Sequence, residues 1–147
     1  MIAIGSDHGG YALKEAVKKH LEEKGYEVHD YGAYSTESVD YALYGAQVAH
    51  AVANGEAEYG VAICSTGIGI SMAANKVHGV RAALCTTPHM AEMTRRHNNA
   101  NVLCMGGLIT EEKTAMEIVD AFFTFEFEGD RHIRRINQLA DIEAGRL

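Results

Sequence analysis

With 147 residues, 47% of them hydrophobic, the chain is long enough to bury a substantial core without disulfides or a metal ion. Thirteen basic and twenty acidic residues give a formal net charge of −7, which argues against nucleic acid as a partner, since its binding depends on neutralised phosphates. The apolar runs are much shorter than the roughly 18 residues that suggest a membrane span, so we expect no membrane partner either.

The N-terminus and the cysteines indicate a cytoplasmic protein. Met1 leads directly into an apolar run at residues 2–4, without the basic region and cleavage site of a secretory signal. The cysteines, Cys64, Cys85 and Cys104, are odd in number and form no CxxC pair, so we expect reduced thiols and no disulfide framework. No HxxxH or CxxC grouping suggests zinc, and we predict no metal.

Apolar periodicity and turn signals predict strands that alternate with helices along the chain. Strands are expected at 1–6, 26–31, 59–64, 80–85 and 101–105, and helices at 11–24, 41–53, up to 76, from 88, 111–123 and 131–144. This alternation predicts one α/β domain over residues 1–147, a three-layer α/β/α Rossmann-like fold with a five-stranded parallel sheet. In the first helix, Leu13 and Val17 mark the apolar face, and Lys14 and Lys18 belong to the opposite, polar face.

The segment 61–76 carries the most informative chemistry. A buried strand ends at Cys64, the small-residue loop 65–69 follows, and a helix begins there. The backbone N–H groups of such a loop and the helix dipole form a site for negative charge. Ligands of parallel sheets bind beyond the carboxyl ends of the strands, where this loop and the turn 7–10 both lie.

Each feature of this segment also has a purely structural interpretation. Cys64 is either an inert small apolar residue or a reactive thiol activated by the helix N-terminus. The loop is either a tight turn that needs glycine or an oxyanion site to which Thr66 adds a hydroxyl. It is not a GxGxxG loop and lacks the lysine of a P-loop, so a nucleotide site is disfavoured.

Several further residues also have both a structural and a functional interpretation. Asp7 either caps the following turn or supports chemistry beside the titratable His8. His97 lies among polar neighbours, which fits a functional histidine or a solvated helix end. Arg131 and Arg135 are four residues apart on one helix face, so they could hold one phosphate or form a solvated charge cluster, and this C-terminal helix could reach a partner subunit.

Several motifs in fixed order resemble the ribose-5-phosphate isomerase B family, which includes galactose and allose 6-phosphate isomerases. They are G-S-D-H-G-G, V-D-Y, C-S-T-G-I-G-I-S-M-A-A-N-K, V-R-A-A, R-H-N-N-A-N-V-L and G-D-R-H-I-R-R. The resemblance covers essentially the whole chain. It implies a cofactor-free aldose–ketose isomerase of a sugar phosphate, working as a homodimer with shared sites or as a tetramer.

The resemblance also implies roles for individual residues. Cys64 corresponds to the base that moves a proton between C1 and C2, because Ile70 stands where other relatives have a glutamate. The catalytic set it implies is Cys64, Thr66, Asp7 and the partner subunit's His97. The binding set is Ser65, Gly67, Ile68 and Gly69 for the enediolate, Asn98 beside His97, and His8, Arg131 and Arg135 for the phosphate.

The implied reaction interconverts ribose 5-phosphate and ribulose 5-phosphate. The alternatives are a six-carbon substrate, allose or galactose 6-phosphate, or a sugar-phosphate-binding subunit without turnover. An arginine usually follows the glycines of the fifth strand in the family, whereas this chain has Leu108.

Overall fold

The computed structural model describes residues 1–147, and its elements confirm the predicted alternation of strands and helices. The strands are β1 (Ile2–Ser6), β2 (Val28–Asp30), β3 (Tyr59–Cys64), β4 (Ala82–Leu84) and β5 (Val102–Gly106). The helices are α1 (Tyr11–Glu23), α2 (Tyr41–Ala53), α3 (Ile68–Asn75), α4 (Pro88–Asn98), α5 (Glu112–Thr124) and α6 (Arg131–Glu143). The predicted bounds of α2 and β3 match the observed ones, whereas β2 and β4 are shorter than expected.

The five strands form one parallel sheet in the order β2-β1-β3-β5-β4. The two short strands, β2 and β4, are the edges of this sheet and pair on one side only. Because all strands run in the same direction, their carboxyl ends meet at one edge. There the last residue of β3, Cys64, is in register with Gly106 of β5.

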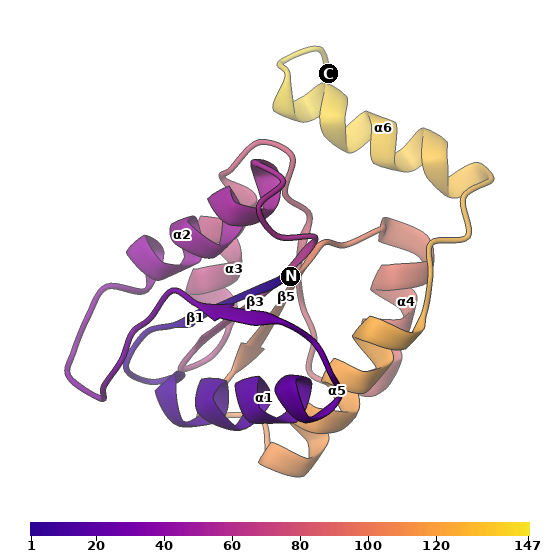
Figure 1. Cartoon of the computed structure of the whole chain (residues 1–147). Helices are drawn as coiled ribbons and strands as arrows, with labels where there is room; N and C mark the ends of the chain where they lie inside the picture. The colour runs from indigo at the N-terminus through magenta and orange to yellow at the C-terminus, as the bar shows by residue number, and fades with distance from the viewer.

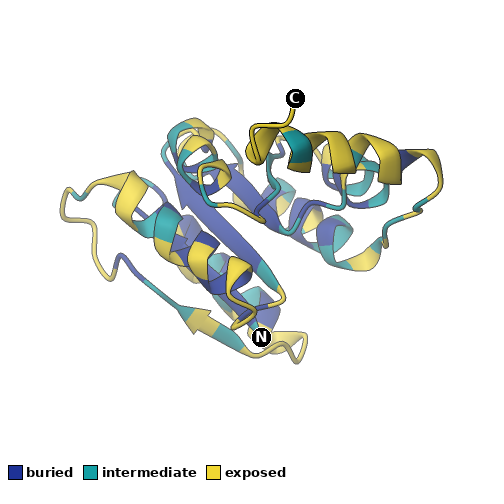
Figure 2. Ribbon diagram, turned by 90° about the horizontal axis from the view of Figure 1, so that it is seen from above, coloured by how far each residue is buried: buried dark blue, intermediate teal, exposed yellow.

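Two hydrophobic cores lie on the two faces of the sheet, which gives the predicted three layers (Figure 1). Side chains of a strand alternate between faces. Ile2 and Ile4 therefore belong to the core beneath α1, α4 and α5, and Ala3 belongs to the core beneath α2 and α3. The central strands β1, β3 and β5 are buried at every residue except Tyr59, which is half-buried (Figure 2). None of the helices combines the length and the apolar character that crossing a membrane requires.

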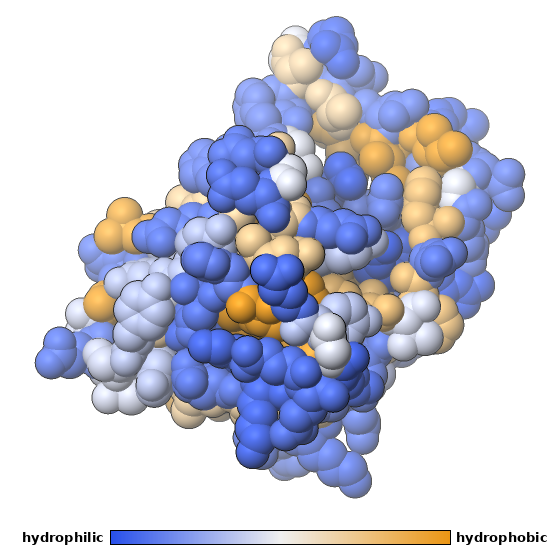
Figure 3. Space-filling view, in the orientation of Figure 1, coloured by the Kyte–Doolittle hydropathy of each residue, from blue (hydrophilic) through white to orange (hydrophobic).

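The last helix, α6, stands apart from these layers (Figure 1). Its one buried residue is His132, and Figure 2 shows the helix mostly exposed. Near its end, the Glu143 carboxylate accepts from the Gly79 N–H at 3.1 and 3.2 Å. A groove of about 820 Å³ separates α6 from α4 and from the segment between α3 and β4. Ile133, Leu139 and Ile142 of α6 stay exposed, and orange atoms in the upper part of Figure 3 mark apolar groups of this region.

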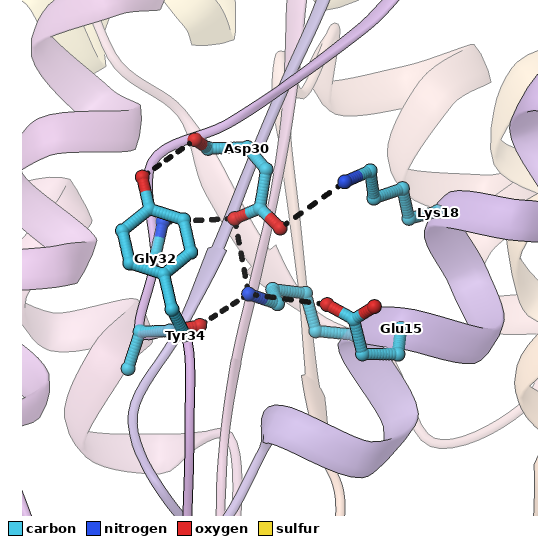
Figure 4. A network of polar contacts seen from close by, with 7 residues as sticks. Glu15, Lys18, Asp30, Gly32 and Tyr34 are labelled. Atoms are coloured by element: carbon cyan, nitrogen blue, oxygen red, sulfur yellow. Dashed lines mark hydrogen bonds and ion pairs between the residues drawn. The ribbon is translucent and has the colours of Figure 1, made fainter.

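Lys14 contradicts the prediction that it lies on the polar face of α1. Its side chain is 0% exposed, and Nζ donates to Asp30 Oδ1 at 3.0 Å and to the Ala33 carbonyl (Figure 4). Asp30 Oδ1 also accepts from the Gly32 N–H at 2.8 Å. The ammonium group is buried because a carboxylate and a carbonyl replace its water, so one lysine joins α1 to the end of β2 and the segment that follows it.

Replacing Lys14 with methionine is expected to lower the free energy of unfolding by about 3 kcal/mol, because it leaves Asp30 and the Ala33 carbonyl without their buried partner. Lys18→Met is the matched control: Lys18 also lies 3.5 Å from Asp30, but it is 31% exposed. Its loss should cost less than about 1 kcal/mol. Urea denaturation of both variants measures the difference, and equal losses would contradict the structural role of Lys14.

Candidate active site

Three loops meet at the carboxyl edge of the sheet. They are residues 7–10 after β1, 65–67 after β3, and Gly107-Leu108 after β5. The Gly107 N–H donates to the Cys64 carbonyl at 2.8 Å, and the Leu108 N–H donates to the Ser65 carbonyl at 3.0 Å. Glycines allow the close approach, since a Cβ at Gly107 would lie 2.6 Å from the Gly9 carbonyl oxygen. The turn after β1 and the loop after β3 are thus joined into one surface.

Cys64 lies at the centre of this surface, as the sequence predicts. Its side chain is buried, and its Sγ accepts from the Gly67 N–H at 3.2 Å. Gly67 adopts φ 81°, a left-handed conformation that favours glycine, and this conformation turns the chain into α3. The sulfur therefore lies within hydrogen-bond reach of an N–H group at the start of a helix.

The same loop presents donors with no partner in the chain. The N–H groups of Ser65, Thr66, Gly69 and Ile70 donate to no group of the protein. The first N–H groups of any helix lack partners within it, and here they begin directly beside a sulfur. Thr66 Oγ1 accepts from the Ile68 N–H at 3.2 Å, so its own hydroxyl hydrogen is free to donate. These groups can hold an oxyanion.

The other two cysteines differ from Cys64. Burial raises the pKa of Cys85 to about 12, and burial also raises the pKa of Cys104. Neither thiol ionises near neutral pH, so both act as inert residues of the core.

Asp7 and His8 follow β1 into the same edge. The buried Asp7 carboxylate accepts from the Gly10 N–H at 3.0 Å, so it closes the turn, whereas the N-cap of α1 is Gly10, without a side-chain cap. His8 Nδ1 accepts from the Val39 N–H at 3.1 Å. Because Nδ1 is the acceptor, Nε2 carries the proton and can donate to an anion.

The remaining predicted site residues lie elsewhere in the chain. His97 and Asn98 end α4, and Arg131 and Arg135 lie in the first half of α6. Because α4 begins at the carboxyl edge and spans 11 residues, its last turn lies about 16 Å away, at the amino edge. There the Arg81 Nε, just before β4, donates to the Asn99 carbonyl at 2.8 Å. One chain therefore separates the predicted residues into a group at each edge.

At the amino edge, His97 belongs to a charged cluster that the sequence did not reveal. Its ring stacks on His132, with centroids 4.3 Å apart and planes 13° apart, and both Nε2 atoms lie 3.7 Å from Glu128 Oε1. The Arg96 guanidinium, 2.5 Å from Glu128 Oε2, holds the pKa of that carboxyl below its usual range. Burial, followed by the charge of His97, lowers the pKa of His132. The signal in the sequence is the i, i+4 spacing of Glu128 and His132.

The carboxyl edge combines open backbone donors, a thiol and a hydroxyl at the ends of parallel strands. In an open α/β sheet this is where small ligands bind, and the donors suit a small anionic compound. Fold and site together define the class: an α/β enzyme for small anionic metabolites.

Comparison with known proteins gives the family. The model of the Ribose/Galactose Isomerase family matches residues 2–139. Ribose-5-phosphate isomerase B of Escherichia coli K12 is 46% identical over 145 residues, which are 99% of this chain and 97% of the relative. The chain therefore belongs to the ribose/galactose isomerase family, and it is an enzyme, an aldose–ketose isomerase.

Solved structures agree with this assignment. The chain is similar to Clostridium thermocellum ribose-5-phosphate isomerase B, with a TM-score of 0.97 and 49% identity over 98% of this chain and 97% of the other. It is also similar to the Mycoplasma genitalium ribose-5-phosphate isomerase B with bound ribulose-5-phosphate, with a TM-score of 0.93 and 41% identity over 97% and 95% of the two chains. The predicted α/β fold with a five-stranded parallel sheet is confirmed.

Proposed function

We propose that the enzyme interconverts ribose 5-phosphate and ribulose 5-phosphate through a cis-enediolate, with Cys64 as the base. The observation that carries this proposal is the position of Cys64 Sγ. It lies at the end of β3, accepts from the Gly67 N–H at 3.2 Å, and is followed at once by unpaired backbone donors. Substrate identity is supported by the relatives with this activity, at 46% and 49% identity.

The reaction needs a base, a group that transfers a proton between O2 and O1, and donors that stabilise the enediolate. The Cys64 thiolate removes the proton from C2 of the open-chain aldose, and the electron pair moves to form the enediolate. The unpaired N–H groups of Ser65, Thr66 and Gly69 stabilise the negative charge on its oxygen, which is the charge that develops in the transition state. The N–H groups of Gly67 and Ile68 already donate within the loop. The Thr66 hydroxyl carries a proton from O2 to O1, and the Cys64 thiol returns its proton to C1, which gives the ketose.

Ring opening and phosphate binding require residues from two subunits. We propose a homodimer in which the amino edge of one subunit faces the carboxyl edge of the other. Asp7 and the partner subunit's His97 would then open the sugar ring, with the partner subunit's Asn98 beside them. His8, through Nε2, would bind the phosphate together with the partner subunit's Arg131 and Arg135, and holding this remote group would orient the reacting carbons.

Two features of the chain support this assembly. Arg131 and Arg135 are exposed and form no ion pair within the chain, so both guanidinium groups are available to an anion. The apolar residues Ile133, Leu139 and Ile142 of α6 are also exposed, the last two beside the groove, and a second subunit would bury them. Without a partner, no residue of the amino edge reaches Cys64.

A six-carbon sugar phosphate is the second candidate substrate, and Leu108 favours it. Leu108 is 77% exposed, and its N–H is bound to the Ser65 carbonyl at the rim of the site, where the family usually has an arginine. Without the positive charge of an arginine, this rim of the site binds a phosphate less tightly. A coupled isomerase assay with ribose, allose and galactose phosphates separates the candidates, and no turnover of the ribose compound would reject the first proposal.

His97→Ala is expected to make the aldose direction depend on uncatalysed ring opening. Ribose 5-phosphate is mainly a ring, whereas ribulose 5-phosphate, whose O5 carries the phosphate, stays open. With increasing variant concentration, the aldose-to-ketose rate should level off at the uncatalysed opening rate, while the reverse rate stays proportional to enzyme. Progress curves over a range of enzyme concentrations measure this, with the exposed His50 as the control position (His50→Ala). An aldose rate proportional to enzyme throughout would contradict a ring-opening role.

A further inference from the structure

Three potential metal ligands meet at the amino edge, outside the proposed chemistry of Cys64. They are His97 of α4, Glu128 of the segment between α5 and α6, and His132 of α6, here called the His97–Glu128–His132 cluster. Their ligand atoms all lie within 4.8 Å of one another. Both histidine Nε2 atoms lie 3.7 Å from the same oxygen, Glu128 Oε1.

His132 gives an independent sign of a ligand. Its side chain is only 6% exposed, and its Nε2 is a buried polar atom with no hydrogen-bond partner. A buried polar group without a partner costs about 1–3 kcal/mol. This atom lies 3.7 Å from Glu128 Oε1, which is too long for a hydrogen bond, so both atoms remain available to a common ligand beside them.

Arg96 prepares the carboxylate for a ligand. Its Nε lies 2.5 Å from Glu128 Oε2, and its Nη1 donates to Glu92 Oε2 at 2.7 Å, so the guanidinium itself is held in place. Oε2 of Glu128 is thus held by Arg96, and Oε1 remains available on the side of the two histidines. Supporting contacts of this kind orient ligands at metal sites.

We propose that the His97–Glu128–His132 cluster binds a divalent transition-metal ion such as Zn²⁺. Two imidazoles and one carboxylate form a donor set that suits zinc and its neighbours, and they leave a fourth position for water. Ligand atoms of a tetrahedral zinc ion lie about 3.3 Å apart. The two distances from a histidine Nε2 to Glu128 Oε1 are 3.7 Å, and all three ligand atoms lie within 4.8 Å of one another, so a small contraction of the cluster would be needed. The prediction of no metal relied on short sequence motifs, and these ligands come from two separate segments.

Metal binding requires a change in the orientation of one imidazole ring. A metal ion lies near the plane of each imidazole that binds it, so the parallel rings of His97 and His132 cannot both bind without a tilt. His97 is 34% exposed and can turn, whereas His132 is buried. Positive charge on Arg96 and Arg131 opposes a cation, so we expect a Kd in the micromolar range, weaker than structural zinc sites.

Binding has a consequence that depends on the proposed function. If the partner subunit's His97 opens the sugar ring, a metal ion that holds His97 removes it from the reaction. Zn²⁺ should then inhibit the aldose direction reversibly, with activity restored by a chelator. The binding site itself does not depend on this consequence, so binding is measured separately from turnover.

The test is a titration of the EDTA-treated full-length protein with Co²⁺, followed by its visible absorption, and competition by Zn²⁺. We expect one Co²⁺ per chain, at least tenfold weaker binding in His132→Gln and Glu128→Gln, and unchanged binding in His50→Gln. Because His132 is buried, His132→Gln could lose binding through a folding defect, and the less buried Glu128→Gln tests the site without that risk. Thermal unfolding measures whether both variants are folded. Equal binding by wild type and both variants, or a thiolate charge-transfer band that disappears in Cys64→Ser, would overturn the proposal.

Discussion

Cys64→Ala is expected to lower kcat by about 10³-fold or more, because it removes the proposed base while the rest of the site remains. The thiol lies in the core beneath α2 and α3, so the change also removes one sulfur from packed surroundings. A small loss of stability will follow, and the unfolding midpoint must be measured beside the rate. A coupled isomerase assay with ribose 5-phosphate gives kcat, and a kcat near that of wild type would show that another residue is the base.

Cys85→Ala is the matched control for this loss. Cys85 is as buried as Cys64, but burial raises its pKa to about 12, so almost no thiolate exists at neutral pH. The control should lose stability to a similar extent and keep kcat within a few-fold of wild type. A large loss of kcat in both variants would point to packing of the sheet rather than to a base at Cys64.

The position of the candidate residues at the carboxyl edge could be predicted from the sequence, because most of them belong to one contiguous segment. Cys64 and the loop that follows come from one strand–loop–helix segment, and the rule that parallel strands end at one edge brings Asp7 and His8 to it. Long elements with strong turn signals were also predicted well, whereas the edge strand β2 keeps only three residues because it pairs with a single neighbour.

Charged residues inside the protein could not be predicted in this way. Periodicity treats Lys14 as polar, yet Asp30 and the Ala33 carbonyl give it a place in the interior. Arg95 stands in a polar run of α4, but it is buried and lies over the Tyr59 ring at 4.6 Å. Both positions depend on partners distant in sequence, which periodicity along one helix does not contain.

The distance between His97 and Cys64 is also invisible in a linear motif. The family resemblance assigns both residues to one site, whereas the fold places them at opposite edges of the sheet. Helix α4 runs back along the sheet, so a helix residue at its C-terminal end cannot reach the carboxyl edge of its own chain. The proposed site shared between two subunits would bring His97 and Cys64 together, and it leads to the second large prediction.

Mixing two impaired variants is expected to restore activity in the aldose direction. In the proposed dimer, each active site takes Cys64 from one subunit and His97 from the other. Cys64→Ala and His97→Ala are therefore complementary, because a hybrid dimer contains one site with both mutations and one intact site. Random re-association gives half hybrid dimers, so about a quarter of the wild-type activity should return.

The experiment requires that the two variants exchange subunits. It also requires assay conditions under which neither variant alone gives a high rate. The two variants are unfolded together in urea, refolded as a mixture, and assayed in the aldose direction at high enzyme concentration, where His97→Ala alone is limited by uncatalysed ring opening. The control is the double variant Cys64→Ala/His97→Ala mixed with wild type, whose hybrid dimers have no intact site. That mixture should keep only the activity of the wild-type dimers that re-form, also about a quarter.

The outcome separates a shared site from two independent ones. If each chain held its own complete site, every site in the mixed single variants would lack one residue, and the mixture would show only the summed activity of its parents. Under the same assumption, wild type mixed with the double variant would keep about half of its activity rather than a quarter. Compared with independent sites, a shared site thus raises the activity of the first mixture and lowers that of the second. A loss of stability in one variant cannot produce both changes.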